Sequence, residues 1–269
     1  ETHLELLGTI ENIAAAKREL PEAILPSGFC VLNGDDKNVS AMRHNVECRI
    51  IDFGILEQCA VRASDIKAFA DRTEFVCTCH AEKFSIALPT QGRHNIYNAL
   101  AAIAAAHELG IGAKEIVEGL STFHSGAMRQ NIINLGYCMV IDDVYNASPL
   151  SMAAALDVLG QMDTGRRVAI LGDMLELGTA AIEAHKRVGN QCAEQGVELL
   201  ITVGELAEHI AVAAQLAGIK QVLHCNNTDE AASELINRLC RNDIVLVKGS
   251  RGMKMEEIVA ALQIHLGGE

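Results

Sequence analysis

The spacing of apolar and polar positions divides the chain into two parts with different patterns. In the first part, apolar and polar residues alternate on both sides of a short turn at 80–82, which predicts a β-hairpin. Apolar residues at helical spacing predict helices, and Gly110 follows one of them, as expected for a left-handed helix end. The predicted strands are 28–33, 49–53, 59–62, 74–79 and 83–88, and the predicted helices are 10–20, which should end near Pro21, 95–109 and 113–120. We therefore expect a mixed sheet with a small antiparallel patch.

The second part alternates short continuous apolar runs with helical patterns. The predicted strands are 138–141, 167–171, 199–203, 221–224 and 244–247, and the predicted helices are 148–159, 180–195, 206–216, 229–239 and 254–266. Continuous apolar strands indicate a sheet buried on both faces, and βα alternation indicates a Rossmann-like, doubly wound parallel sheet. A Ser/Gly/His segment without periodicity separates the two parts, so the predicted α/β domains are residues 1–127 and 128–269.

Composition and charge narrow the classes of protein that fit this pattern. Apolar residues make up 49% of the 269 residues and aromatic residues 3%, as in an aliphatic α/β protein. The net charge of −13 opposes binding to nucleic acid or to an anionic membrane. No apolar run reaches the roughly eighteen residues of a membrane span, and no export signal is present. Nine cysteines without regular spacing favour a cytoplasmic protein with reduced thiols. Cys77 and Cys79 should point the same way from one strand, and packing is favoured over metal binding there.

Polar side chains follow three of the predicted parallel strands, where ligands bind in open α/β sheets. The three clusters comprise Asp142, Asp143, Tyr145 and Asn146; Asp173 and Glu176; and Lys248, Ser250 and Arg251. Helix capping could explain any one cluster by itself. The three together, with a lysine and an arginine among several carboxylates, favour a ligand site at one edge of the sheet.

Several motifs occur in an order that resembles the Mur ligase family of ATP-dependent amide ligases. In the first part they are His3-Leu4-Glu5 with Gly8, the run from Glu11 to Lys17, the run from Val31 to Asp36, and the run from Gly92 to Ala102. In the second part they are the runs from Ile141 to Ala147, from Leu171 to Gly178, and from Val247 to Arg251. The second set is most similar to the family member that adds D-alanyl-D-alanine to UDP-N-acetylmuramoyl-tripeptide in peptidoglycan synthesis.

The resemblance implies a reaction and its partners. Such ligases phosphorylate a substrate carboxylate with ATP, and an amine then attacks the acyl phosphate to form an amide. The expected partners are UDP-N-acetylmuramoyl-tripeptide and D-alanyl-D-alanine, and the expected cofactors are ATP and two Mg2+ ions held largely by oxygen ligands. His3 and, if carbamylated, Lys17 match metal-binding catalytic positions, and Arg129 matches an arginine that reaches the ATP phosphates. A monomer is expected.

The resemblance also implies binding roles for other residues. Asn95 and Asn98 lie on one helix face and carry amides suited to an adenine edge, with a helix cap at Asn95 compatible with that role. Asp143 matches a ribose contact, and Tyr145 is assigned to the nucleotide with it. Asn146, Lys248, Ser250 and Arg251 are the candidates for D-alanyl-D-alanine, because its carboxylate needs a cation and hydrogen-bond donors. Asp173, Glu176 and His185 match family positions without an assignable role.

The chain departs from the family pattern at several points. No G-x-x-G-K-T-T phosphate loop is present, which predicts a partial central ATPase domain and a fragment that lacks the N-terminal domain and is inactive alone. Val144, Ser148 and the segment 126–129 also differ from the usual residues. Three alternatives stay open: a sister Mur ligase, a ligase like folylpolyglutamate synthetase, or a non-catalytic module that binds a nucleotide or peptide.

Overall fold

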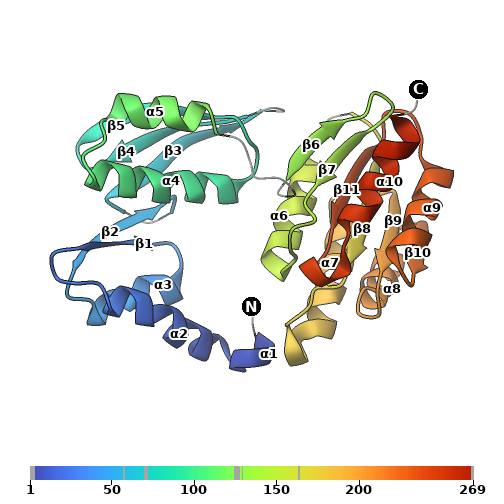
Figure 1. Cartoon of the computed structure of the whole chain (residues 1–269), viewed down its shortest axis with the longest axis horizontal. Helices are drawn as coiled ribbons and strands as arrows, with labels where there is room; N and C mark the ends of the chain where they lie inside the picture. Colours follow the sequence, from blue (N-terminus) through green and yellow to red (C-terminus); the bar gives the residue numbers. More distant parts are fainter. Residues whose placement is uncertain are drawn as a thin grey trace. The chain divides into compact units, whose positions relative to one another are not determined.

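The chain folds into two compact units. The structure is a computed structural model that describes residues 4–56, 58–69, 72–123, 128, 130–162 and 164–267 (Figure 1). One unit comprises Thr9–His124, and the other comprises Ser125–Glu269 together with Glu1–Gly8. Helix α1 (Leu4–Leu7) thus groups with the second unit, where the backbone N–H of Glu5 donates to the carbonyl of Glu176 at 3.1 Å. The sequence had placed this segment in the first domain, and the domain boundary at 127/128 stays a prediction.

The Thr9–His124 unit contains a five-stranded mixed sheet in the order β1-β2-β3-β4-β5. Its strands are β1 (Phe29–Asn33), β2 (Arg49–Gly54), β3 (Val61–Ala68), β4 (Thr73–Cys79) and β5 (Glu82–Leu88). The first three strands are parallel and the last three antiparallel, so the predicted hairpin and antiparallel patch are confirmed. The strand expected at 59–62 instead begins at Val61 and continues to Ala68, because its second half pairs with β4 although its side chains are largely exposed.

Helices cover this sheet and close its core. Helices α4 (Arg93–Glu108) and α5 (Ala113–Ser121) pack over the sheet through a cluster that includes Ile86, Leu100 and Ile116 (Figure 1). Gly110 follows α4 with φ 86°, as predicted. Helix α3 (Lys37–Ala41) contacts β1, and α2 (Ile10–Glu22) packs against α3 and the 3-10 turn η1 (Met42–Asn45). Helix α2 ends at Glu22, one residue after Pro21, so the expected end near Pro21 is confirmed.

The second unit is built on a six-stranded sheet in the order β10-β9-β8-β11-β7-β6. Its strands are β6 (Asn131–Asn134), β7 (Met139–Asp142), β8 (Arg167–Gly172), β9 (Leu199–Val203), β10 (Gln221–Cys225) and β11 (Ile244–Lys248). Five strands are parallel, and all five were predicted. Strand β6 was missed. It pairs antiparallel with β7 at the sheet edge, and its short, half-exposed pattern carries little signal.

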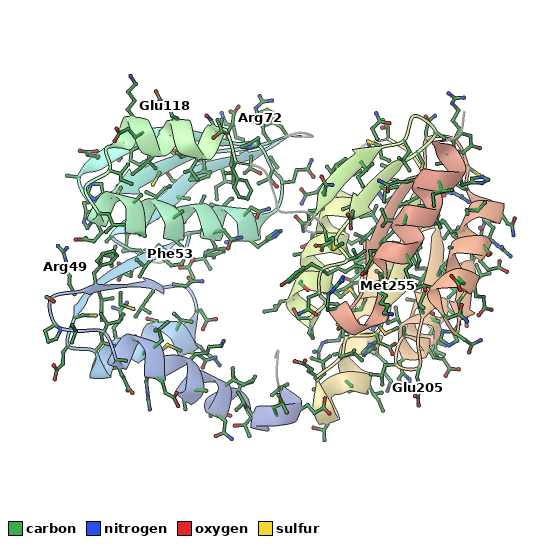
Figure 2. The ribbon with its side chains drawn as sticks, viewed as in Figure 1. Arg49, Phe53, Arg72, Glu118, Glu205 and Met255 are labelled. Carbon is green, nitrogen blue, oxygen red and sulfur yellow. The ribbon has the colours of Figure 1, made fainter. Side chains whose placement is uncertain are left out.

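Helices pack on both faces of this sheet, which confirms the doubly wound architecture. Helices α6 (Pro149–Gly160), α7 (Ala181–Glu194) and α8 (Glu208–Leu216) form one apolar layer, and α9 (Thr228–Arg238) and α10 (Glu256–Leu266) form the other (Figure 1). The short turns are η2 (Gly178–Ala180) and η3 (Arg251–Met253). Met255, which is labelled in Figure 2, is fully buried. A Cβ added at Gly172 or Gly249 would lie 2.9 or 2.7 Å from its side chain. These glycines therefore let α10 begin close beneath the strand ends.

The structure also bears on two predictions from composition. Within the described residues, no helix has the length and apolar character needed to cross a membrane. All nine cysteines are free thiols. Cys77 and Cys79 are both fully buried and face the same side of β4, as expected.

Candidate ligand site at the strand ends

Three loops meet at one edge of the six-stranded sheet. Strand β11 lies between β8 and β7, all three run in the same direction, and the predicted polar clusters follow their carboxyl ends. The backbone N–H of Ser250 donates to the carbonyl of Asp173 at 3.0 Å, and the N–H of Leu175 donates to Ser250 Oγ at 2.9 Å. Ser250 Oγ also lies 3.5 Å from the carbonyl of Ala147. The loop after β11 thus binds to both neighbouring loops.

A buried ion pair underlies this edge. Lys248 is 2% exposed, and its ammonium donates to Asp143 Oδ2 at 2.7 Å and to the carbonyl of Asn146 at 2.8 Å. Asp143 Oδ1 accepts a hydrogen bond from the backbone N–H of Gln130 at 3.2 Å. Lys248, Asp143 and the 4% exposed Ser250 therefore hold the loops in place. Their direct contact with a ligand stays a prediction, because these side chains are engaged within the protein.

The accessible layer of the edge contains three of the other predicted residues. Tyr145 is 47% exposed, and Asn146 and Arg251 are exposed as well. The Arg251 guanidinium pairs with Glu256 Oε1 at 2.9 Å while its side chain remains half exposed. Arg251 and Asn146 are thus the cation and the amide that a bound carboxylate could reach.

Two acidic side chains next to this layer carry unpaired oxygens. Among the described residues, Asp142 Oδ1 and Glu256 Oε2 are buried and have no hydrogen-bond partner. Burial raises the pKa of Asp142, and repulsion from Asp143 and Glu256 adds to this, although a hydrogen bond from the backbone of Val144 opposes it. Sequence reasoning missed Glu256, because an acidic residue in the first turn of a helix is ordinary.

Asp173 and His185, which had no assignable role, now have structural ones. Asp173 Oδ1 accepts from the backbone N–H of Ala207 at 2.7 Å. His185 Nε2 lies 3.0 Å from the N–H of Met174, and Nδ1 lies 2.7 Å from the carbonyl of Ala181. The N–H of Met174 can only donate, so Nδ1 carries the proton and the ring is neutral. Burial lowers the pKa of His185, which agrees with that state. Both side chains fix the loop after β8.

The predicted adenine residues lie at the start of α4. Asn95 Nδ2 donates to the carbonyl of Gln91 at 2.7 Å and lies 3.2 Å from Thr90 Oγ1. The helix N-cap is Gly92, so the expected cap at Asn95 is wrong; its side chain instead braces the preceding loop. Asn98 is exposed, and its Nδ2 lies 3.3 Å from Asn95 Oδ1. Asn98 is therefore the more accessible amide.

A residue that sequence reasoning left without a role organises this part of the unit. Asp35 Oδ2 accepts from the Tyr97 hydroxyl at 2.7 Å and from the backbone N–H of Ile55 at 2.6 Å. It thereby joins the loop after β1 to the loop after β2 and to α4. Its position inside a quoted motif was the signal that could have identified it.

The predicted magnesium ligands are not assembled by the described residues. Lys17 is an exposed residue of α2, and an unmodified ammonium repels a cation. His3 and Arg129 lie outside the described residues. Around Lys17, the described part of the chain brings together no three His, Cys, Asp or Glu side chains that could share an ion. The two-magnesium site stays a prediction.

Comparison with known proteins identifies the family. The Mur ligase middle domain matches residues 1–106, and the glutamate ligase domain of Mur ligases matches residues 128–251. The chain belongs to the Mur ligase family. Its two matched regions are the middle and C-terminal domains of that family, with the α/β folds expected from the sequence.

Individual Mur ligases are similar along nearly the whole chain. The UDP-N-acetylmuramoyl-tripeptide–D-alanyl-D-alanine ligases of Bacillus subtilis and Escherichia coli are 32% and 31% identical to it, each over 97% of this chain. The crystal structure of MurF from Acinetobacter baumannii superposes with a TM-score of 0.87 at 32% identity, covering 97% of this chain and 57% of that one. The chain spans 57% and 58% of the two curated relatives, so the activity of a whole Mur ligase is a proposal for it.

Proposed function

We propose that this chain supplies the middle and C-terminal domains of a cytoplasmic ATP-dependent ligase that adds D-alanyl-D-alanine to UDP-N-acetylmuramoyl-tripeptide. The observation that carries the proposal is the edge of the six-stranded sheet, where exposed Asn146 and Arg251 lie in the two loops that follow Asp143 and Lys248, the residues of a buried ion pair. Sequence similarity supports it. The D-alanyl-D-alanine ligase of Bacillus subtilis and the MurF of Acinetobacter baumannii are each 32% identical to the chain, whereas the Thermotoga maritima MurC and a pseudomurein peptide ligase are 16% and 19% identical. Nine free thiols support the placement in the cytoplasm.

In this proposal the described residues bind and orient the substrates. Arg251 receives the dipeptide carboxylate in its planar guanidinium, and Asn146 adds an amide that can donate or accept. Lys248 and Ser250 act as positioning residues, because they fix the loops that carry Asn146 and Arg251. Asn98 is assigned to adenine, and Tyr145 with Asp143 to the rest of the nucleotide. ATP would supply the phosphoryl group that activates the tripeptide carboxylate for attack by the dipeptide amine.

Binding of the dipeptide can be tested with the 269-residue chain itself. Calorimetric titration should show binding of D-alanyl-D-alanine and much weaker binding of L-alanyl-L-alanine, which has the same charges and opposite chirality. Arg251→Gln should weaken binding by about tenfold or more, as expected for loss of a charged hydrogen bond worth about 1.5–3 kcal/mol. Arg238→Gln, on the exposed face of α9, is the matched control. Equal binding of the two dipeptides, or no effect of Arg251→Gln, would refute the assignment.

Ligation requires a phosphate-binding loop, which the 269 residues do not contain. Joining the chain to the N-terminal part of the Bacillus subtilis ligase would provide one. The joined protein should release ADP only when UDP-N-acetylmuramoyl-tripeptide and D-alanyl-D-alanine are both present. Turnover that accepts a different amine in place of the dipeptide would favour a sister ligase instead.

A further inference from the structure

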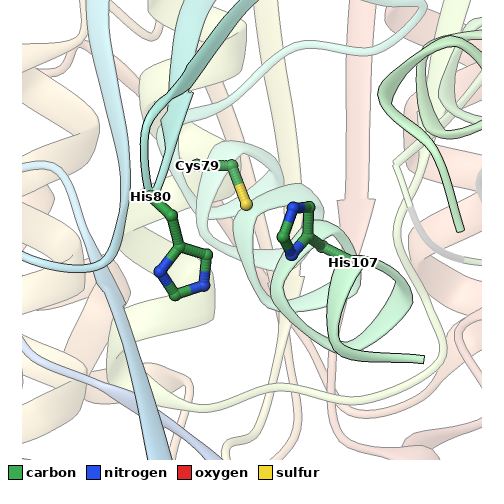
Figure 3. A group of neighbouring side chains, drawn as sticks. All are labelled: Cys79, His80 and His107. Carbon is green, nitrogen blue, oxygen red and sulfur yellow. The ribbon is translucent and has the colours of Figure 1, made fainter. Parts of the chain in front are cut away.

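A cysteine and two histidines converge at one end of the five-stranded sheet. Strand β4 ends at Cys79, His80 begins the turn into β5, and His107 lies in the last turn of α4. Figure 3 shows the three side chains directed toward one another, with the sulfur of Cys79 between the two imidazole rings. One potential ligand atom from each residue lies within 4.8 Å of the other two, and the ring centroids of the histidines are 5.2 Å apart.

The surrounding fold holds these residues in place. Cys79 is fully buried and pairs with Val61 on one side and Glu82 on the other. The backbone N–H of His80 donates to the carbonyl of Ala60 at 2.7 Å, and its φ of 50° turns the chain sharply after Cys79. A left-handed conformation is uncommon for a residue with a side chain. The group therefore combines a fixed sulfur with imidazoles from a turn and a helix end.

We propose that Cys79, His80 and His107 form a binding site for Zn2+ or a divalent ion of similar preference. Thiolate and imidazole are the ligands that zinc takes in proteins, whereas Mg2+ prefers oxygen. Tetrahedral zinc, with bonds of about 2.3 Å to sulfur and about 2.0 Å to nitrogen, needs ligand atoms about 3.5 Å apart. His80 is exposed and His107 half-buried, so small rotations of their rings can close the group to that spacing.

Glu82 or a water molecule completes the coordination. Glu82 stands opposite Cys79 in the β4–β5 register and is exposed. The thiol proton leaves to solvent when the metal binds, since the thiolate is the ligand. A bound ion would tie the β4–β5 turn to the end of α4 and stabilise the Thr9–His124 unit. The site uses none of the residues assigned to the ligase reaction, so its failure would leave the proposed function untouched.

Packing alone is the competing explanation, and Cys77 supplies its control. Cys77 lies two residues before Cys79 on the same face of β4 and is also fully buried. It is not part of the group that could share an ion. A thiol that only fills space should thus behave the same at position 79 as at position 77.

Cobalt titration of the 269-residue chain, followed by zinc competition, tests the site. One Co2+ per chain should bind with a near-ultraviolet band from thiolate-to-cobalt charge transfer, and Zn2+ should displace it and raise the melting temperature. Cys79→Ser should abolish the band, while Cys77→Ser should retain it. His107→Gln and His80→Asn should weaken binding about tenfold or more. Asparagine suits the left-handed backbone at position 80, and His44→Gln, on the exposed turn η1, should change nothing.

Two results would overturn the site. One is the absence of a stoichiometric charge-transfer band in the unaltered chain. The other is a band that survives His107→Gln and His80→Asn without loss of affinity. If Cys79→Ser does not fold, these two histidine variants decide the question, because their side chains lie outside the fully buried core. A band lost equally in Cys77→Ser and Cys79→Ser, with both variants folded, would also contradict the assignment.

Discussion

Among the residues of the candidate site, Lys248 should contribute most to the free energy of unfolding of the second unit. Lys248→Met removes the partner of a buried carboxylate, and an unpaired buried charge costs about 3–5 kcal/mol of the free energy of unfolding. The combined variant Lys248→Met with Asp143→Asn should recover part of that loss, because no charge then remains unpaired. Urea unfolding of the second unit would measure both. Lys220→Met, at an exposed position, is the control and should change the free energy of unfolding by no more than about 0.5 kcal/mol. If Lys248→Met changed it as little as Lys220→Met does, the buried-pair interpretation would be wrong.

Asp142 should make the second unit less stable as pH rises. Its pKa is raised by burial and by Asp143 and Glu256, so the folded state holds the proton more tightly than the unfolded state, where an aspartate pKa is about 3.9. The stability gained from this proton is present below that value and lost as pH rises through the raised pKa. Lys248 pairs with Asp143 and Arg251 pairs with Glu256, yet repulsion between Glu256 and Asp142 still raises the pKa of Asp142.

Asp142→Asn should therefore raise the free energy of unfolding at pH 7 relative to the unaltered chain, with the difference vanishing toward pH 4. The side-chain amide of the new asparagine can also donate hydrogen bonds, and Glu256 Oε2 is a buried oxygen that has no donor in the unaltered chain. Chemical unfolding across this pH range would show the trend. Glu205→Gln, an exposed acid elsewhere in the unit, serves as the control. A difference that does not change with pH would rule out the protonation argument.

Among the elements, the connection from β8 to α7 depends on a single neutral histidine. Burial lowers the pKa of His185, so below about pH 6.5, the ordinary histidine value, the unfolded state takes up a proton that the folded state resists. Stability should accordingly fall as pH drops from about 6.5 toward the lowered pKa. His185→Gln should flatten this slope and cost about 1–3 kcal/mol at pH 8, because the N–H of Met174 or the carbonyl of Ala181 loses its partner.

Unfolding measured at pH 8 and at pH 5.5 would test the role of His185, with exposed His265→Gln as the matched control. The two variants should differ most at pH 8. Should His185→Gln lose as much stability on acidification as the unaltered chain does, the slope would come from other groups.

The strands that the sequence predicted well are those with uninterrupted apolar runs. The run that became β9 is fully buried, and its bounds were predicted without error. Strand β6 was missed because four alternating residues at a sheet edge resemble a loop. The site edge was predicted because strand ends of a parallel sheet converge. Its division into a buried layer with Lys248 and an exposed layer with Arg251 was not predictable, since burial depends on tertiary packing of residues distant in sequence.

For the whole molecule, the two units should respond separately to damage in their cores. Leu100 is fully buried in the core beneath α4, and Leu246 is fully buried in the core between the six-stranded sheet and α6, α7 and α8. Each unit has its own apolar core, which is the basis of independent cooperative unfolding. Leu100→Ala and Leu246→Ala should each remove about 2–5 kcal/mol, but from different units.

Calorimetric melting with hydrogen exchange would separate these two effects. Exchange should accelerate in Thr9–His124 for Leu100→Ala and in Ser125–Glu269 for Leu246→Ala, while the other unit keeps its protection. A single transition that both substitutions lower equally would show that the chain unfolds as one cooperative body. The proposed zinc site lies in the Thr9–His124 unit, so Zn2+ should stabilise that unit alone. Added Zn2+ should therefore offset the stability lost in Leu100→Ala and leave the stability lost in Leu246→Ala unchanged.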